Sequence, residues 1–383
     1  MNICLGFRSP DFSPGDPLIV RSVLKLLAKQ LNSHTSVWYG EASKRFNKGV
    51  DVQPSLDHIV QCKHFVKPGT PSWLMPFDTA VYKHFVEQGK SICMIGLGGS
   101  SGWMAQHVNN ETIKLLAKYL NDGGINFLSV RSQTTYSNWI NAGADPEKVH
   151  LLPCPGYFFL SPNKPTISKK VVALDLLDPH RNAVVKPTGN FPRDYCTTFY
   201  KYFERIKYLY DELVEHGAEV HLCCHEGTSA QSTIHLIQNK TITNSKQLLN
   251  SRTEEKASSL FNLVTGIKEH FDGLKVHFFN AEEEFADFYN SIDVYIGGRI
   301  HGALPCAGIG KPVLALGVDM RQYTLEQIPY IAKLDIRYGH WNPDTVLDWY
   351  ATLNPRGVSL SLLEFRKRKE EQYKALLDKN VRF

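Results

Sequence analysis

Long apolar runs and clustered charge are both missing from this sequence. No stretch approaches the roughly 18–20 apolar residues that a membrane-spanning helix needs. Residues 1–8 lack the basic segment and the long apolar core of a secretory signal peptide. The formal net charge of +5 is modest and spread along the chain, so it gives no argument for nucleic acid as a partner. We therefore expect a cytoplasmic protein that has no transmembrane segment and binds no nucleic acid.

Several common site motifs are missing as well. The eight cysteines form no Cys-x-x-Cys pair, which indicates reduced thiols in a reducing compartment. No Gly-Lys-Ser/Thr follows the turn at Gly98-Gly99, which excludes a Walker loop there. The Gly-x-Gly-x-x-Gly spacing of a dinucleotide site is also absent from that turn. No internal repeat of solenoid length is visible.

What is present is a regular alternation of strands and helices. A chain of 383 residues with 43% hydrophobic residues favours two domains with real cores. The polar, proline-rich segment 161–165 interrupts the alternation and predicts a linker. We expect an α/β fold of two Rossmann-like domains that face each other across a cleft, a GT-B-like arrangement. The predicted domains are residues 1–160 and 166–350.

The last segment, residues 351–383, is predicted to form a C-terminal helix that crosses back to the first domain. Its helical periodicity covers residues 359–377. The basic run at residues 366–369 lies between glutamates, and we interpret it as a solvated helix face. Packing across both domains is the favoured role of this helix, and peripheral contact with an anionic membrane surface is the alternative.

Individual elements follow from periodicity and turn residues. Residues 40–76 are less periodic, and residues 67–73 within them are predicted to form a loop. In the helix at 18–31, Asp16 is expected as the N-cap and Pro17 as the first helical residue. Strands are predicted at 3–7, 36–39, 91–97, 125–130, 149–152, 171–176, 219–224, 276–279, 293–297 and 313–316. Helices are predicted at 18–31, 78–88, 111–120, 197–216, 258–271 and 282–290. A further helix is predicted to run through residue 139.

The turn from Gly298 to Gly302 is the strongest candidate site. It follows a buried strand, begins a short helix, and carries Arg299 and His301 between glycines. Open α/β folds bind ligands at the carboxyl ends of strands, and the N–H groups at a helix start attract anions. We predict that Arg299 and His301 bind a phosphate or carboxylate, with the backbone of Ile300 and Gly302 as further donors. The alternative is a pair of buried side chains that only hold the turn.

Other candidates lie at the ends of predicted strands. Arg131 is expected either to bind an anion or to pair with a carboxylate at the edge of the core. Gly98 and Gly99 form a turn through which backbone can approach a ligand. His225 is a candidate pocket residue in the run His-Leu-Cys-Cys-His at 221–225. That run raises the question of zinc, but no second ligand pair with suitable spacing occurs, so we predict no metal.

One family resemblance covers most of the chain. Gly298 to Ala303, followed by Ala307-Gly308-Ile309-Gly310-Lys311-Pro312-Val313, resembles the C-terminal signature of the polysaccharide pyruvyl transferase family. Three weaker matches occur in the expected order: Gly15-Asp16, Gly98-Gly99, and the unit that runs from Val130-Arg131 to Leu152-Pro153. Cys154-Pro155 departs from this pattern, because the family commonly has Asp-Pro there.

The resemblance implies transfer of a pyruvyl group from phosphoenolpyruvate onto two hydroxyls of a sugar in a polysaccharide or its precursor. Phosphate leaves and a cyclic ketal forms. Arg299 is then expected to bind the donor anion, and His301 to bind the donor and transfer a proton. Asp16 and Glu282 are candidates to take a proton from a sugar hydroxyl. No cofactor is expected, and the acceptor is a sugar or a lipid-linked saccharide.

Two other functions fit the same scaffold. The first is a GT-B glycosyltransferase that uses a sugar nucleotide. The second is a non-catalytic carbohydrate-binding protein. Fold alone does not choose among the three.

Overall fold

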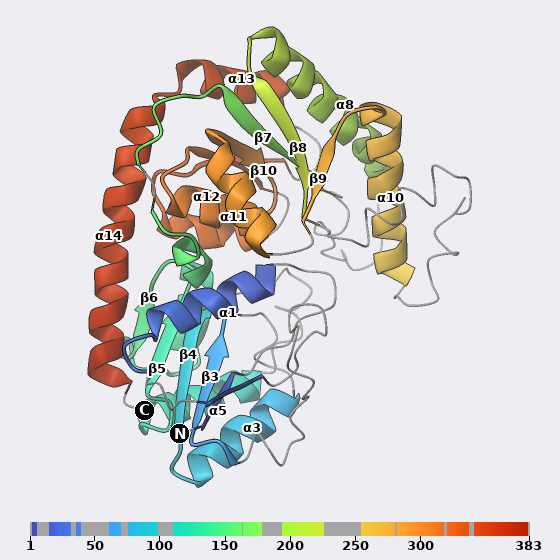
Figure 1. Ribbon diagram of the computed structural model, residues 1–383. Helices are drawn as coiled ribbons and strands as arrows, with labels where there is room; N and C mark the ends of the chain where they lie inside the picture. Colours follow the sequence, from blue (N-terminus) through green and yellow to red (C-terminus); the bar gives the residue numbers. More distant parts are fainter. Residues whose placement is uncertain are drawn as a thin grey trace.

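The computed structural model has an α/β fold built on two parallel sheets (Figure 1). Element bounds and contacts are given for the described residues, which are 2–5, 15–31, 36–39, 61–69, 76–98, 110–162, 164–177, 194–225, 254–279, 282–317, 320–336 and 341–381.

The first sheet has six parallel strands in the order β2-β1-β3-β4-β5-β6. Their side chains are mostly apolar where they are described, as expected for a parallel sheet that helices cover on both faces. The strands are β1 (Asn2–Leu5), β2 (Ser36–Tyr39), β3 (His64–Pro68), β4 (Ser91–Leu97), β5 (Phe127–Val130) and β6 (Val149–Leu151).

The second sheet also has six parallel strands, in the order β12-β11-β10-β7-β8-β9. The chain enters at the central strand β7, moves outward to β8 and β9, and then returns to the other side of β7 at β10. The boundary between β7 and β10 is therefore a topological switch point, where open α/β sheets leave a crevice. The strands are β7 (Val171–Leu176), β8 (Glu219–Cys224), β9 (Val276–Phe278), β10 (Val294–Gly297), β11 (Val313–Gly317) and β12 (Ala332–Asp335).

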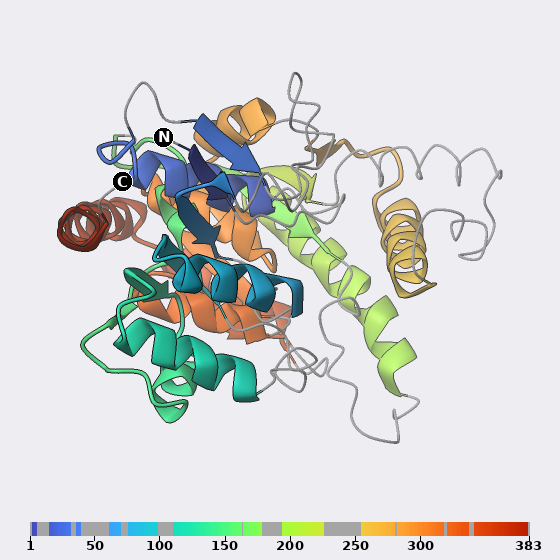
Figure 2. The same ribbon diagram turned by 90° about the horizontal axis from the view of Figure 1, so that it is seen from below.

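Helices connect most consecutive strands and cover the sheets (Figures 1 and 2). In the first half they are α1 (Gly15–Leu26), α3 (Pro76–Glu87), α5 (Asn110–Asn121), α6 (Gln133–Asn141) and the 3-10 helix η2 (Pro155–Phe158). In the second half they are α8 (Asp194–Glu215), α10 (Glu254–Phe271), α11 (Glu282–Ser291), α12 (Ile300–Gly308), the 3-10 helix η4 (Met320–Gln327), α13 (Pro343–Thr352) and α14 (Pro355–Asn380).

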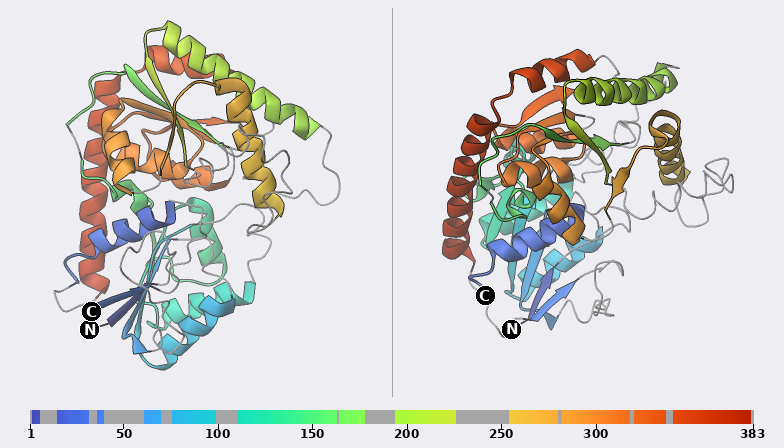
Figure 3. Two further views of the ribbon diagram at one scale, coloured as in Figure 1. Left: turned by 45° about the vertical axis from the view of Figure 1, so that its right-hand side comes forward. Right: turned by 45° about the horizontal axis from the view of Figure 1, so that its top comes forward.

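The two halves share one hydrophobic cluster. It contains side chains from α1, η2, α12 and α14, including Ile19, Tyr157, Leu304 and Leu362. In addition, each sheet has a separate core on its outer side. Helix α14 runs along one side of the molecule past both sheets, as the views in Figure 3 agree. This confirms the predicted C-terminal helix that crosses back, and the carboxyl edges of the two sheets face each other across the shared cluster (Figure 1).

Several predicted elements need correction. Helix α1 begins at Gly15, before the expected N-cap Asp16, and ends at Leu26. Strand β3 lies in the less periodic segment 40–76, where no strand is predicted, and it includes Lys67 and Pro68 of the predicted loop. Helix α14 begins at Pro355, because Asn354 caps it: the Asn354 side chain accepts a hydrogen bond from the Gly357 N–H.

The basic run on α14 is not uniformly solvated. Arg366 is buried, whereas Lys367 and Arg368 are exposed. The expected solvated face therefore holds only for part of the run, and Arg366 faces the protein interior.

Two further observations concern the cysteines and whether a described helix could cross a membrane. The seven described cysteines are buried, and no disulfide links them. Among the described helices, none combines the length and the apolar character that crossing a bilayer would require.

Candidate functional site

The candidate site is the turn between β10 and α12, at the switch point of the second sheet. Arg299 takes an extended conformation (φ −88°, ψ 116°) directly before the helix, and its carbonyl accepts hydrogen bonds from the N–H groups of Gly302 and Ala303, both at 3.0 Å. Helix α12 thus starts at the carboxyl end of a central strand. The arrangement directs the positive end of the helix dipole toward the turn.

Two buried side chains fix the backbone of Arg299. The Arg299 N–H donates to Oδ2 of Asp175 at 3.1 Å, and Oη of Tyr295 donates to the Arg299 carbonyl at 3.3 Å. Glycine is required where these groups approach: a Cβ at Gly302 would lie 2.3 Å from Tyr295 Oη, and one at Gly297 would lie 2.3 Å from Asp175 Cβ. The backbone of Arg299 is therefore held at both its N–H and its C=O, and this limits the positions that the Arg299 side chain can reach.

A buried chain of hydrogen bonds continues beneath the turn. The Nδ1 atom of His225 lies 2.7 Å from Oδ1 of Asp175, and its Nε2 atom is hydrogen-bonded to Oη of Tyr289. Burial holds the pKa of Tyr289 well above its ordinary value, so the phenol stays protonated and can donate to Nε2. His225 Nδ1–H then donates to Asp175. The chain Tyr289–His225–Asp175 ends at the backbone of Arg299.

His225 is thus placed under the turn with both ring nitrogens in hydrogen bonds. Its ring is buried among the aromatic side chains of Phe279, Phe285, Tyr289 and Tyr295. Direct contact between His225 and a substrate stays a prediction, and the position that the structure gives it is one of support.

The same cluster contains the residues that most resemble a metal site. Ligand atoms of Asp175, Cys223 and His225 lie within 4.8 Å of one another. Burial keeps the pKa of the Cys223 thiol well above its ordinary value, which favours the protonated thiol over the thiolate that binds metals. Asp175 already accepts hydrogen bonds from Arg299 and His225. The geometry is accounted for by a hydrogen-bond network, and the expectation that no metal is needed stays a prediction.

A small cavity adjoins the turn at the carboxyl ends of β10 and β11. It is lined by Gly298, Arg299 and Ile300, and by Gly317 and Gln322 on the other side. Ile300 is buried as the first residue of α12, and His301 is half-buried as the second. Its volume of about 10 Å³ is close to the least that holds a single water molecule, so it marks a small gap beside Arg299.

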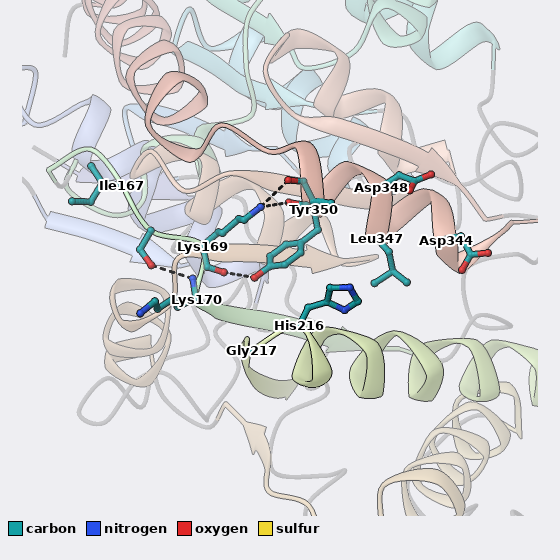
Figure 4. Close-up of a pocket in the computed structure, with 11 residues that line it drawn as sticks. Ile167, Lys169, Lys170, His216, Gly217, Asp344, Leu347, Asp348 and Tyr350 are labelled. Atoms are coloured by element: carbon teal, nitrogen blue, oxygen red, sulfur yellow. Dashed lines mark hydrogen bonds between the residues drawn. The ribbon is translucent and has the colours of Figure 1, made fainter.

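A larger cavity, of about 820 Å³, lies elsewhere (Figure 4). Lys169, His216 and Tyr350 line it. Lys169 and His216 precede β7 and β8, so this cavity is at the amino edge of the second sheet, opposite the edge that carries Arg299. None of the predicted site residues lines this cavity, so we do not assign the candidate site to it although it is the larger of the two cavities described.

Arg131 occupies the corresponding edge of the first sheet. It follows β5, is buried, and donates from Nη1 to Sγ of Cys154 at 3.2 Å. It packs so closely on Gly98 that a Cβ there would lie 2.0 Å from its Nε. Within the described parts of the chain, no acidic side chain pairs with Arg131, and its Nε has no hydrogen-bond partner.

The other predicted residues are only partly described. Asp16 lies at the second position of α1 and Glu282 at the first of α11, but their side chains are outside the described part of the structure. Gly99 also lies outside it. Their predicted roles therefore stay predictions.

Sequence reasoning missed Asp175, Tyr289 and Tyr295. A signal existed for Asp175: it is the single charged residue in the predicted buried strand 171–176, and a buried carboxylate needs hydrogen-bond donors. No comparable signal marked the two tyrosines, because buried tyrosines are common in cores.

Comparisons with known proteins agree with this architecture. A model of the polysaccharide pyruvyl transferase family matches residues 14–320. No curated protein matches the chain. Among solved structures, Staphylococcus aureus MnaA with UDP has a TM-score of 0.55 at 10% identity, covering 98% of this chain and 97% of that one. Anabaena HepE with UDP-glucose has a TM-score of 0.55 at 10% identity, covering 99% and 100%.

A third neighbour is the UDP-GlcNAc 2-epimerase from Neisseria meningitidis bound to UDP-GlcNAc. Its TM-score is 0.52 at 9% identity, with 99% of this chain and 100% of that chain covered. At such low identity these likenesses establish the fold, which is of the GT-B type, and nothing about the ligand.

Proposed function

The chain belongs to the polysaccharide pyruvyl transferase family, and from that membership we propose that it moves a pyruvyl group from phosphoenolpyruvate onto two hydroxyls of a sugar. The products are a cyclic pyruvate ketal and inorganic phosphate. The observation that carries the proposal is the Arg299–His301 turn, whose backbone is fixed at a helix start and at the switch point of the second sheet.

The donor explains why such a turn is useful. Phosphoenolpyruvate carries a phosphate and a carboxylate, and both need cations or N–H donors. Arg299 supplies a guanidinium, and the start of α12 supplies N–H groups and a favourable dipole. The buried carboxylate of Asp175 accepts a hydrogen bond from the Arg299 N–H, so it holds the backbone of the turn. The arrangement supports binding of the donor anions.

The reaction needs proton transfer in both directions. A proton adds to the vinyl carbon, which leaves an oxocarbenium-like centre, and one sugar hydroxyl attacks it and loses its proton. Phosphate then leaves, and the second hydroxyl closes the ring with loss of another proton. One of the two released protons replaces the one consumed, and the other leaves with phosphate or solvent. His301 is the side chain proposed to transfer a proton, because an unperturbed imidazole has a pKa of about 6.5.

The test is an assay of purified protein with phosphoenolpyruvate and a panel of sugar acceptors. The expected result is phosphate release that requires both substrates, with a pyruvate ketal in the product by mass spectrometry. A parallel reaction replaces phosphoenolpyruvate with UDP-sugars. Nucleotide release there, without phosphate release from phosphoenolpyruvate, would establish glycosyl transfer instead. Glycan binding without turnover of either donor would establish a binding protein.

His301 has a matched control. His301→Gln should lower kcat by about a hundredfold or more, the usual scale for loss of a general acid or base. His216→Gln changes an exposed histidine at the end of α8, beside the cavity of Figure 4, and should leave turnover unchanged. Full turnover by a folded His301→Gln protein would remove His301 from proton transfer.

A further inference from the structure

Helix α14 is positioned to connect the donor turn with the first sheet. Its 26 residues span roughly 39 Å at about 1.5 Å per residue, and it runs beside both sheets (Figures 1 and 3). The match to the family model ends at residue 320, before this helix begins. The buried residues of α14 include one arginine and one tyrosine, Arg366 and Tyr373.

Arg366 joins three segments that are distant in sequence. Its side chain is only 2% exposed, and its Nη1 donates to the Gly308 carbonyl at 2.7 Å and to the Tyr157 carbonyl at 3.2 Å. Nη2 donates to the Phe158 carbonyl at 3.3 Å. Gly308 is the last residue of α12, whereas Tyr157 and Phe158 belong to η2. One guanidinium therefore binds α12 and η2 to α14.

Helix α12 and η2 approach so closely at Gly308 that no side chain fits at that position. A Cβ at Gly308 would lie 1.9 Å from the Tyr157 carbonyl oxygen. Tyr157 also returns to α14, because its Oη donates to the Leu362 carbonyl at 2.9 Å. Glu370 lies 3.6 Å from Nε of Arg366, which gives the buried cation a nearby negative charge. The Nη atoms of Arg366 are thus hydrogen-bonded to carbonyl groups, whereas its Nε faces Glu370 without a hydrogen bond.

A second tie connects α14 to the first sheet. Tyr373 Oη donates to the Pro153 carbonyl at 3.2 Å and lies 3.1 Å from Ser129 Oγ on β5. Ser129 Oγ in turn accepts the Gly96 N–H at 2.8 Å. Ser129 is two residues before Arg131, so these hydrogen bonds connect α14 to the carboxyl edge of the first sheet.

We propose that Arg366 is a positioning residue that sets the distance between the Arg299–His301 turn and the first sheet. The turn begins α12 and Arg366 holds the end of the same helix, so a displacement at Gly308 moves the turn as well. The inference rests on the proposed function, in which the donor binds at the turn and the acceptor is bound from the side of the first sheet. Arg366 contacts neither substrate; it aligns them.

The kinetic test compares Arg366→Met, Arg366→Lys and the control Lys367→Met, which changes the exposed neighbour on the same helix. Arg366→Met should lower kcat by about tenfold or more, because small misplacements of reacting groups are costly, with KM for phosphoenolpyruvate within about twofold. Arg366→Lys should recover part of kcat, since one ammonium can replace only some of the three bonds. Lys367→Met should match the wild type.

Hydrogen exchange supplies a readout that needs no substrate. In Arg366→Met, peptides covering the end of α12 and η2 should exchange faster than in the wild type, whereas peptides from α5 and α6 should not change. Unchanged kcat, or a rise in KM for phosphoenolpyruvate with kcat preserved, would overturn the proposal. So would a loss of kcat without faster exchange at these two segments. If Arg366→Met fails to fold, Arg366→Lys carries the same two measurements.

The two proposals can fail separately. If the wild type releases no phosphate from phosphoenolpyruvate, the proposed function is wrong, and the exchange comparison still decides whether Arg366 holds α12 to η2. If the wild type is active and Arg366→Met is equally active, only the positioning role is wrong.

Discussion

The two buried arginines at the facing sheet edges are held in different ways. Arg299, on the second sheet, is fixed through its backbone, by Asp175 at the N–H and Tyr295 at the C=O. Arg131, on the first sheet, is held through its side chain, by the Cys154 thiol and by close packing on Gly98. The comparison shows one arginine whose backbone is fixed by buried side chains and one whose side chain is fixed by its neighbours.

The largest expected effect comes from removing the buried carboxylate. Asp175→Ala leaves His225 Nδ1–H and the Arg299 N–H without their acceptor, and each buried donor left unsatisfied costs about 1–3 kcal/mol, so we expect a total loss of about 2–6 kcal/mol. Urea denaturation should show that loss in the free energy of unfolding. Asp348→Ala, at an exposed aspartate of α13, should change it by less than about 0.5 kcal/mol. A cost below 1 kcal/mol for Asp175→Ala would show that the network does not hold the turn.

A smaller steric change should break the same support from the other side. Gly302→Ala places a Cβ against Tyr295 Oη, and we expect a loss of about 1–3 kcal/mol in unfolding free energy, as for other overpacked sites. Gly156→Ala is the matched control, because the nearest atom to its Cβ would be 3.8 Å away. Equal thermal denaturation curves for the two variants would contradict the close approach at Gly302.

Arg131 should be less costly to replace. Arg131→Met removes a buried cation that no described acid pairs with, and apolar replacement of buried charges is often neutral, so the unfolding free energy should change by about 1 kcal/mol or less. If Arg131 binds substrate, phosphate release should still fall, by about tenfold for one lost interaction worth roughly 1.4 kcal/mol. Stability loss as large as that of Asp175→Ala would make Arg131 a structural residue.

The smallest effect expected is none at all. Because hydrogen bonds already engage Asp175 and His225, dialysis against EDTA should leave both phosphate release and the melting temperature unchanged. Loss of activity that added Zn²⁺ restores would instead identify the Asp175–Cys223–His225 cluster as a metal centre.

Much of the fold could be predicted from local patterns. The strand at 91–97, the strand at 219–224 and the glycine-flanked turn with Arg299 and His301 are all visible in the sequence, because buried parallel strands are apolar runs and their ends carry glycine. Strand β3 was missed because residues around it have no clear period.

The partners within the site could not be predicted in the same way. Asp175 and His225 are 50 residues apart, and Tyr289 is 64 residues from His225. Only the packing of β7, β8 and α11 brings them together. Arg366 was interpreted as solvated because its neighbours are charged, whereas tertiary packing buries it against carbonyl groups of α12 and η2.

Binding of phosphoenolpyruvate, measured by titration calorimetry, tests the role of the Arg299 turn most directly. Wild-type protein should bind one phosphoenolpyruvate per chain. Folded Arg299→Met should bind it about a hundredfold more weakly, the scale for losing a charge-assisted bond worth about 3 kcal/mol. Arg368→Met, at an exposed arginine of α14, should bind like the wild type. Equal affinity of Arg299→Met and the wild type would contradict the assignment of the donor site.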